Sequence, residues 1–197
     1  REERTLCLAD ANHTSVRLQI YKEGGSAVKV LVDGDSCGII GQIERIANRY
    51  GVPVIIFADM QRSIHSEYSS VHYVLPEKDA ADKAIIDDLD KNDIVVTADY
   101  ALAALVLAKC GKCIHPHGFV YTDGNILSLL TKRYMIRKML QKYPRRKIKG
   151  YDVGPKMRCN FNRSFPLLLE ETIKKKQSTY EEEEKCEKAI KTGSKIF

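Results

Sequence analysis

The sequence contains no apolar run as long as the roughly 20 residues that a transmembrane helix requires. The first residues, Arg-Glu-Glu-Arg, do not begin the pattern of a secretory signal. These two absences argue against a protein that is anchored in a membrane or exported. We therefore expect no membrane partner and a cytoplasmic location.

Cysteine is also scarce, since the 197 residues contain six cysteines that are scattered along the chain. Small secreted domains that depend on disulfides concentrate their cysteines in a much shorter chain, so this class is excluded. A chain of this length can bury a hydrophobic core of its own and usually forms one main domain. We expect a reduced protein built mainly from one domain.

Acidic residues are nearly absent from one long stretch, although the chain as a whole carries a net charge of only +6. Between Gly124 and Leu169 the single acid is Asp152. The cations of this stretch are Lys132, Arg133, Arg137, Lys138, Lys142, Arg145, Arg146, Lys147, Lys149, Lys156, Arg158 and Arg163. Such a surface suits a polyanion, and nucleic acid is the expected partner. A solvated helix and tail is the alternative interpretation.

The rest of the chain is organised around the stretch 28–37, which reads VKVLVDGDSC. Its apolar, β-branched run stops abruptly at Asp33-Gly34-Asp35, which predicts a buried strand of a parallel sheet. Further strands are expected at 53–58, 71–75, 94–97 and 113–115, and helices at 39–50, 79–86, 101–110, 125–142 and 161–173. Strands that alternate with helices predict an α/β fold, with a mainly parallel sheet and helices on both faces.

Three of the expected strands end in aspartate, at Asp33, Asp59 and Asp99. In open α/β sheets the carboxyl ends of parallel strands share one rim, and ligands bind there. Asp35 follows the first of these residues at a spacing of two, so both carboxylates can converge if the chain is still extended. The repeated aspartates indicate a functional rim, although Asp-Gly is also a common turn pair.

The helix after the third strand adds two acids that share one face, Asp79 and Asp82. Hard divalent cations prefer carboxylate oxygens, and one or two such ions can neutralise a phosphodiester and activate a water. We therefore predict a Mg²⁺ or Mn²⁺ site with five ligands: Asp33, Asp35, Asp79, Asp82 and Asp99. Taken alone, each aspartate can also be a turn residue or a helix cap, and Asp79 is the best candidate for a cap.

Several segments, in this order, resemble the YaiI/YqxD family, an uncharacterised group of bacterial proteins regarded as PIN-like. The matching pieces are VDGDSC (32–37), RYGVPVIIFA (49–58), DAADKAI (79–85), DIVVTADYALA (93–103), PHGFVYTDGNI (116–126), Arg133 and GPK (154–156). The family usually has Asp-Ala-Asp-Ala-Cys-Pro where this chain has Gly34, Ser36 and Gly38. It usually has Pro-Arg-Gly where this chain has Pro116-His117-Gly118.

The resemblance implies a three-layer α/β/α PIN-like domain over residues 28–165, with an acidic metal centre. Outside it lie an N-terminal extension, 1–27, and a basic, helical or flexible C-terminal tail, 166–197. Within the extension, residues 5–9 and 16–21 are expected to pair as an edge hairpin.

PIN nucleases place one Asp after the first strand, an acid on a central helix and another Asp after the fourth strand. In this chain the matching positions are Asp33, Asp82 (or Asp79) and Asp99. Asp35 matches the second Asp of the YaiI/YqxD pattern. Thr97 resembles the hydroxyl that often accompanies the last acid.

The expected function is a divalent-metal-dependent nuclease that hydrolyses phosphodiesters, with RNA as the expected substrate. Its catalytic acids are Asp33, Asp35, Asp82 and Asp99, and its substrate contacts are Thr97, Arg133, Arg145, Arg146, Lys147 and Lys156. One alternative is a phosphatase of the haloacid dehalogenase type, with Asp33 as nucleophile and Asp35 as acid. Another is a non-catalytic nucleic-acid-binding module. A homodimer is an arrangement that the sequence leaves open.

Overall fold

The computed structural model describes residues 28–144 and 159–191. The expected N-terminal hairpin, 5–9 and 16–21, lies outside the described residues. The same holds for four of the expected substrate contacts: Arg145, Arg146, Lys147 and Lys156. Within the described part of the chain, no helix is long and apolar enough to cross a membrane.

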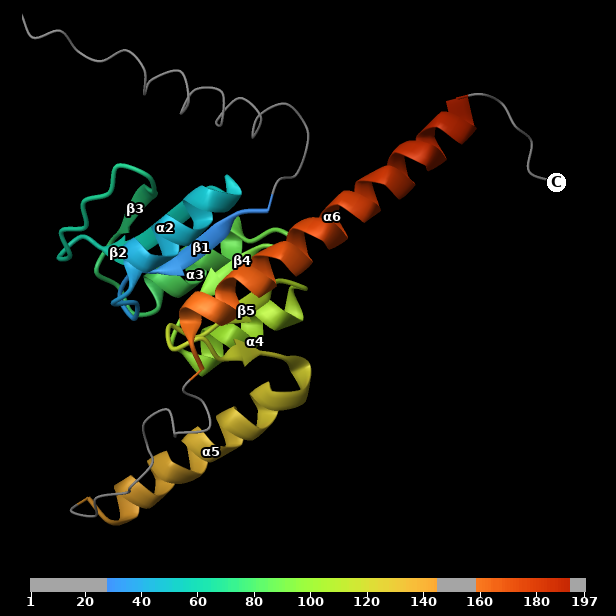
Figure 1. The fold of residues 1–197 in the computed structure, drawn as a ribbon. Coiled ribbons are helices and arrows are strands. Elements are labelled where there is room, and N and C mark those ends of the chain that lie inside the picture. Colours follow the sequence, from blue (N-terminus) through green and yellow to red (C-terminus); the bar gives the residue numbers. More distant parts are fainter. Residues whose placement is uncertain (1–27, 145–158, 192–197) are drawn as a thin grey trace, which may run out of the picture.

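A six-stranded sheet in the order β3-β2-β1-β4-β5-β6 forms the centre of the molecule (Figure 1). The strands are β1 (Val30–Asp33), β2 (Val54–Asp59), β3 (Ser70–Val74), β4 (Ile94–Val96), β5 (Lys112–Ile114) and β6 (Val120–Tyr121). All neighbours pair in parallel except β5 and β6, which are antiparallel. The expected mainly parallel sheet is confirmed. The short β6 was not expected, because two residues are too few to establish an alternating pattern.

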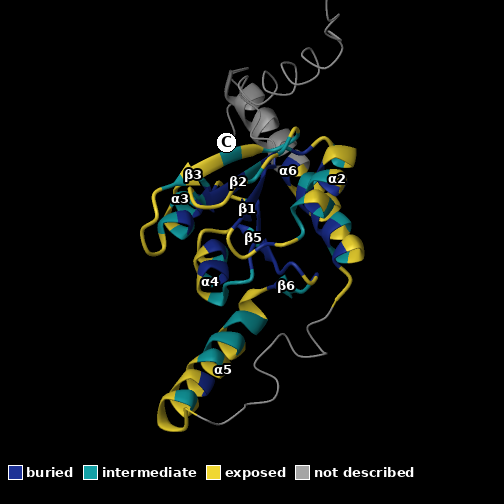
Figure 2. Ribbon diagram, turned by 90° about the vertical axis from the view of Figure 1, so that its left-hand side faces the viewer, coloured by how far each residue is buried: buried dark blue, intermediate teal, exposed yellow. Residues whose placement is uncertain are grey.

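Helices cover both faces of this sheet, as a three-layer α/β/α fold requires (Figure 1). They are α2 (Ile40–Tyr50), α3 (Ala80–Asp88), α4 (Tyr100–Ala108), α5 (Asp123–Lys142) and α6 (Phe161–Lys191). One core lies between the sheet and α2 and α6, and the other lies between the sheet and α3 and α4. Helix α5 packs against α4 and then extends away from the body with a largely exposed surface (Figure 2).

The alternation of side chains along the central strands explains the two cores. Val30 and Val32 of β1 point into the core beneath α2 and α6, while Leu31 points into the core beneath α3 and α4. The same alternation places Ile94 and Val96 of β4 in the first core. Because both faces are buried, these strands have the continuous apolar sequences from which they were predicted.

Helix α6 is longer than the segment 161–173 that its sequence pattern indicated. Its buried residues include Phe165, Leu169, Thr172 and Lys176, so the boundary expected after residue 165 lies inside this helix. The charged residues after Ile173 obscured the pattern, because a buried lysine interrupts the apolar face. The ammonium of that lysine ends in the body of the protein, 3.8 Å from Asp93.

Asp79 occupies the N-cap position of α3, as expected, and its carbonyl accepts the N–H of Lys83 at 3.0 Å. Its backbone has a φ of 58°, however, and its side chain makes no capping hydrogen bond. The carboxylate is therefore not engaged by the helix. Gly51 ends α2, also as expected, with a φ of 66° that favours glycine.

Candidate metal centre

The carboxyl ends of β1, β2 and β4 surround a cavity of about 280 Å³, which we call the acidic cavity. Seven carboxylates line it: Asp33, Asp35, Asp59, Glu77, Asp79, Asp82 and Asp99. The structure thus brings together all five residues that were predicted as metal ligands. They come from the end of β1, the start of α3 and the end of β4. Parallel pairing of the strands is what makes these distant segments meet.

Two acids of the cavity, Asp59 and Glu77, were not among the predicted ligands. Asp59 could have been included, because it ends β2 as Asp33 ends β1. Glu77 lies in the connection between β3 and α3, where no periodic pattern marks the direction of a side chain. Only the tertiary structure places it at the cavity.

Asp33 is the most deeply placed of these acids, with 4% of its surface exposed. Its Oδ2 accepts hydrogen bonds from the hydroxyls of Ser36, at 2.6 Å, and Thr97, at 2.7 Å. Its Oδ1 accepts backbone N–H groups of Asp35 and Ser36, both at 3.3 Å. These four donors fix the orientation of the Asp33 side chain at the floor of the cavity.

Thr97 was expected to contact substrate, but it is fully buried. Its hydroxyl donates to Asp33 and accepts the backbone N–H of Asp99 at 3.0 Å. Ser36 makes a second link, because its hydroxyl oxygen accepts the N–H of Ala98 at 3.1 Å. Thr97 is therefore a positioning residue that joins the carboxyl ends of β1 and β4. A hydroxyl at this point was predicted, but its role was not.

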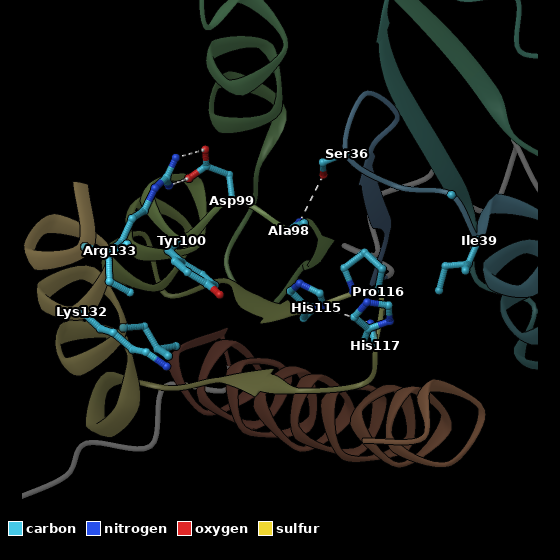
Figure 3. A pocket seen from close by; sticks show the side chains of 13 residues that line it. Ser36, Ile39, Ala98, Asp99, Tyr100, His115, Pro116, His117, Lys132 and Arg133 are labelled. Atoms are coloured by element: carbon cyan, nitrogen blue, oxygen red, sulfur yellow. Dashed lines mark hydrogen bonds and ion pairs between the residues drawn. The ribbon is translucent and has the colours of Figure 1, made fainter. Parts of the chain in front are cut away.

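Asp99 lies at the mouth of the cavity and begins α4. Its Oδ1 accepts the N–H of Ala101 at 2.6 Å and the Nη1 of Arg133 at 2.7 Å, while Nη2 lies 3.4 Å from Oδ2 (Figure 3). Although burial acts to raise the pKa of Asp99, the hydrogen bond from Arg133 lowers it below the usual range. The guanidinium comes from α5, so this helix reaches the edge of the acidic site.

A second arginine, Arg62, lies on the opposite side and was not predicted. Its Nη1 donates to the carbonyl of Gly34 at 2.8 Å, and its Nε lies 3.6 Å from Asp35. Asp35 also accepts the N–H of Asp59 at 3.2 Å. The polar loop after β2, in which Arg62 lies, showed no pattern that predicts this contact.

The pKa of Asp82 reflects the crowding of negative charges around the acidic cavity. Burial, followed by the negative charges of Asp33, Asp99, Asp79 and Asp35, raises the pKa of Asp82 to about 6. Burial disfavours a charge of either sign, whereas the repulsion from neighbouring carboxylates disfavours only a further negative charge. A cation in the cavity would remove that repulsion.

The raised pKa predicts how stability depends on pH in the absence of metal. In the unfolded chain the carboxyl ionises near its ordinary pKa of 3.8, while in the folded protein it ionises near 6. The folded state therefore holds the proton longer, and stability falls as pH rises between these two values. We expect Asp82→Asn to match the wild type at pH 4 and to be more stable at pH 7.

Urea denaturation in EDTA at both pH values measures this difference. Asp87→Asn is the matched control, because Asp87 is on the same helix, is exposed and does not line the acidic cavity. An Asp82→Asn variant that is less stable than the wild type at pH 7 would contradict the proposed repulsion.

The residues of the cavity fit a hard divalent cation by their chemistry, because every charged group that lines it is a carboxylate. In the arrangement seen, however, no three His, Cys, Asp or Glu side chains of the described residues form a ready ligand set for one ion. Asp33 is held by hydroxyls, Asp35 faces Arg62 and Asp99 pairs with Arg133. The carboxylates would have to exchange these partners for a metal.

The sequence model described as "Uncharacterized BCR, YaiI/YqxD family" matches residues 31–171. The chain belongs to the YaiI/YqxD family. The match begins in β1, ends in α6 and includes every residue that lines the acidic cavity. The family membership that the sequence motifs indicated is thus confirmed.

Three curated relatives of this YaiI/YqxD chain are each named UPF0178 protein. The one from Natranaerobius thermophilus is 34% identical over 77% of this chain and 100% of its own length. The one from Alkaliphilus oremlandii is 37% identical, over 75% of this chain and 95% of its own length. The one from Lachnoclostridium phytofermentans is 39% identical over 56% of this chain and 74% of its own length. No solved structure matches the chain.

Proposed function

We propose that this YaiI/YqxD protein is a PIN-like, divalent-metal-dependent nuclease that hydrolyses the phosphodiester bonds of RNA in the cytoplasm. The observation that carries the proposal is the convergence of the five predicted carboxylates at the carboxyl edge of a parallel sheet. The cationic helix α5 borders the same edge, through Arg133. Acids that can hold a metal therefore lie beside cations that can hold phosphate.

A Mg²⁺ or Mn²⁺ ion in the cavity would neutralise charge on the phosphoryl group and activate a water. Asp35, Asp82 and Asp99 are the residues that would hold it. Each of them has a carboxylate at the cavity, and none is as completely enclosed by donors as Asp33. Asp33 keeps the floor of the site negative, and Ser36 and Thr97 keep its carboxylate in place.

Arg133 has a second role in this proposal. It is paired with Asp99 in the structure, and it also lines the cavities on either side of that pair. If Asp99 were to hold a metal, the Arg133 guanidinium would be able to donate to a phosphate oxygen, which it matches in a bidentate geometry. In the structure, the bond between Arg133 and Asp99 keeps both groups ordered.

The placement of Asp33 supports a metal site over the phosphatase alternative. A nucleophilic carboxylate needs an oxygen that can reach the phosphorus of a substrate. Both oxygens of Asp33 are occupied by hydrogen bonds, and only 4% of the residue is exposed. A buried, fully hydrogen-bonded carboxylate is better suited to organising a site than to attack.

Metal is expected to stabilise the wild-type protein. A ligand that binds only the folded state at a hundred times its dissociation constant adds about 2.7 kcal/mol, which shifts the Tm of a chain of this size by roughly 5 to 10 °C. We expect this shift with Mn²⁺ for the wild type and Asp87→Asn, and little or none for Asp82→Asn. Thermal melts with Mn²⁺ and with EDTA measure it, and equal shifts in all three proteins would contradict the site.

Cleavage assays with Mg²⁺ or Mn²⁺ test the proposed reaction directly. The substrates are single- and double-stranded RNA, the same forms of DNA, and p-nitrophenyl phosphate as a phosphomonoester. Metal-dependent cleavage of RNA strands supports the nuclease. Hydrolysis of the phosphomonoester alone would instead support the phosphatase. Nucleic-acid binding without any hydrolysis would support the alternative of a non-catalytic nucleic-acid-binding module.

A further inference from the structure

A second cavity, of about 590 Å³, adjoins the acidic cavity and was not predicted from the sequence. Ser36 and Asp99 line both cavities, so the two lie next to each other after the end of β4. We call it the histidine pocket, and six of its lining residues carry the argument: Ser36, Asp99, Tyr100, His115, His117 and Lys132. Its volume is within the range of roughly 300 to 1,000 Å³ that is typical of small-molecule sites.

Two imidazole rings form one wall of the histidine pocket. The rings of His115 and His117 lie side by side, with their centroids 5.0 Å apart and their planes inclined by 34° (Figure 3). Tyr100 lies across from them, with its hydroxyl directed toward the histidines in this view. The buried ring of Tyr121 packs against both sides. Its centroid lies 6.0 Å from that of Tyr100 and 6.2 Å from that of His115. The rings are thus held in place before a ligand binds.

The loop that carries both histidines is fixed by its packing on α6. Gly118 has a φ of 85°, and a Cβ at this position would lie 2.5 Å from the backbone nitrogen of Phe161. The N–H of Gly118 donates to the carbonyl of His115 at 2.7 Å. Only glycine permits this close approach to the start of α6, so the turn presents His117 at the surface of the pocket in one orientation.

His115 is a buried residue, and among the described residues its only side-chain hydrogen bond is the one that Nδ1 accepts. It is 4% exposed, and its Nδ1 accepts the N–H of His117 at 3.0 Å. Burial, together with the nearby His117, lowers the pKa of His115 to about 4, so the ring is neutral at physiological pH. Since Nδ1 is the acceptor, the proton resides on Nε2, which is left to donate to a ligand.

Cations of α5 form the opposite wall. Lys132 is exposed and, within residues 28–144 and 159–191, forms no ion pair. Arg133 lines the same wall, where it pairs with Asp99. The pocket therefore combines flat rings, one fixed donor and a positive charge. These are the groups that recognise a nucleotide, through its base face, its ring acceptors and its phosphate.

We propose that the histidine pocket binds a single nucleotide of the substrate, the one that flanks the phosphodiester at the acidic cavity. This inference rests on the proposed nuclease function, which it extends by identifying a subsite. The base lies against His117 and Tyr100, His115 donates to an acceptor on the base, and Lys132 binds the phosphate. Purines and pyrimidines both have such acceptors, so the subsite tolerates either kind of base.

Binding of mononucleotides in EDTA tests the subsite without any need for metal or cleavage. The probes are 5′-AMP, 5′-UMP, adenosine and inorganic phosphate, titrated into the full chain by calorimetry. Both mononucleotides should bind, and adenosine and phosphate should each bind more weakly. Stacking and a charged hydrogen bond each contribute about a factor of ten or more to affinity. His117→Ala should therefore lower the affinity for the mononucleotides and for adenosine by about that factor.

Lys132→Ala should lower the affinity for the mononucleotides by a similar factor and leave the affinity for adenosine unchanged. Lys138→Ala is the matched control, because Lys138 is on the same helix but does not line the pocket. Circular dichroism of His117→Ala checks that the fold is retained, as expected for an exposed residue. Mononucleotides that do not bind, or that bind both pocket variants as tightly as the wild type, would overturn the inference.

The outcome also separates this inference from the proposed function. Mononucleotide binding with the stated variant effects, but without strand cleavage, would support the pocket and remove the nuclease. Metal-dependent RNA cleavage by a protein that does not bind mononucleotides would support the nuclease and remove the pocket as a subsite.

Discussion

Asp99→Asn is expected to lower the rate of metal-dependent RNA cleavage by about three orders of magnitude, because a bound metal contributes several kcal/mol to the transition state. An amide is a poor ligand for a hard cation. The fold should be retained, since asparagine is as good a helix cap as aspartate and can still accept the N–H of Ala101. RNA binding should be unchanged or slightly tighter, because Arg133 loses its partner and one negative charge is removed.

Single-turnover cleavage with excess Mn²⁺ measures the rate, and titrations at several salt concentrations in EDTA measure the affinity. Asp87→Asn removes the same charge from an exposed position outside the acidic cavity and should cleave RNA like the wild type. If Asp99→Asn cleaves at the wild-type rate, the nuclease proposal in this form is wrong. If it fails to cleave because it no longer binds RNA, Asp99 contributes to affinity rather than to chemistry.

Leu169→Ala is expected to lower the free energy of unfolding by about 2 to 5 kcal/mol, which is the usual cost of emptying a filled leucine site. Leu169 of α6 is completely buried against the sheet, beside Phe165 and Leu168. Residues 166–197 were expected to be a tail, and a tail would not show such an effect. The prediction therefore tests whether α6 is part of the core.

The same helix offers a control of the same residue type. Leu167 is 60% exposed, so Leu167→Ala should change the stability by only about 0.5 kcal/mol or less. Urea denaturation of both variants at pH 7 gives the two values. Equal effects at the two positions would contradict the packing of α6 that the structure describes.

The sequence predicted β1, β2 and β4, because these strands are largely buried on both faces. Each of them is a short apolar run that leads into a polar residue, and this pattern is local. The strands β1 and β4 and their aspartates were therefore correctly placed. The two-residue β6 and the end of α6 were not, since one is too short for a pattern and the other has a lysine within its buried face.

The acids of the candidate site could be predicted for the same reason, whereas their partners could not. Asp33 and Asp99 follow strands that the pattern identifies, so the rules of parallel sheets bring them to one rim. Arg62 and Arg133 come from a loop and from an exposed helix, where many cations look alike. No local feature distinguishes the arginine that reaches an aspartate from its neighbours.

The sequence by itself determined the fold class and the acidic rim, because the apolar pattern of each segment and the alternation of strands and helices can be identified along the chain. Its motifs indicated the family by resemblance. Only the tertiary structure decided that Thr97 supports Asp33 from within the core and that Glu77 reaches the acidic cavity. It alone also placed His115 and Tyr100 in the lining of a second cavity. These arrangements depend on which distant residues touch, and that is settled when the helices pack onto the sheet rather than by the spacing of residues along the chain.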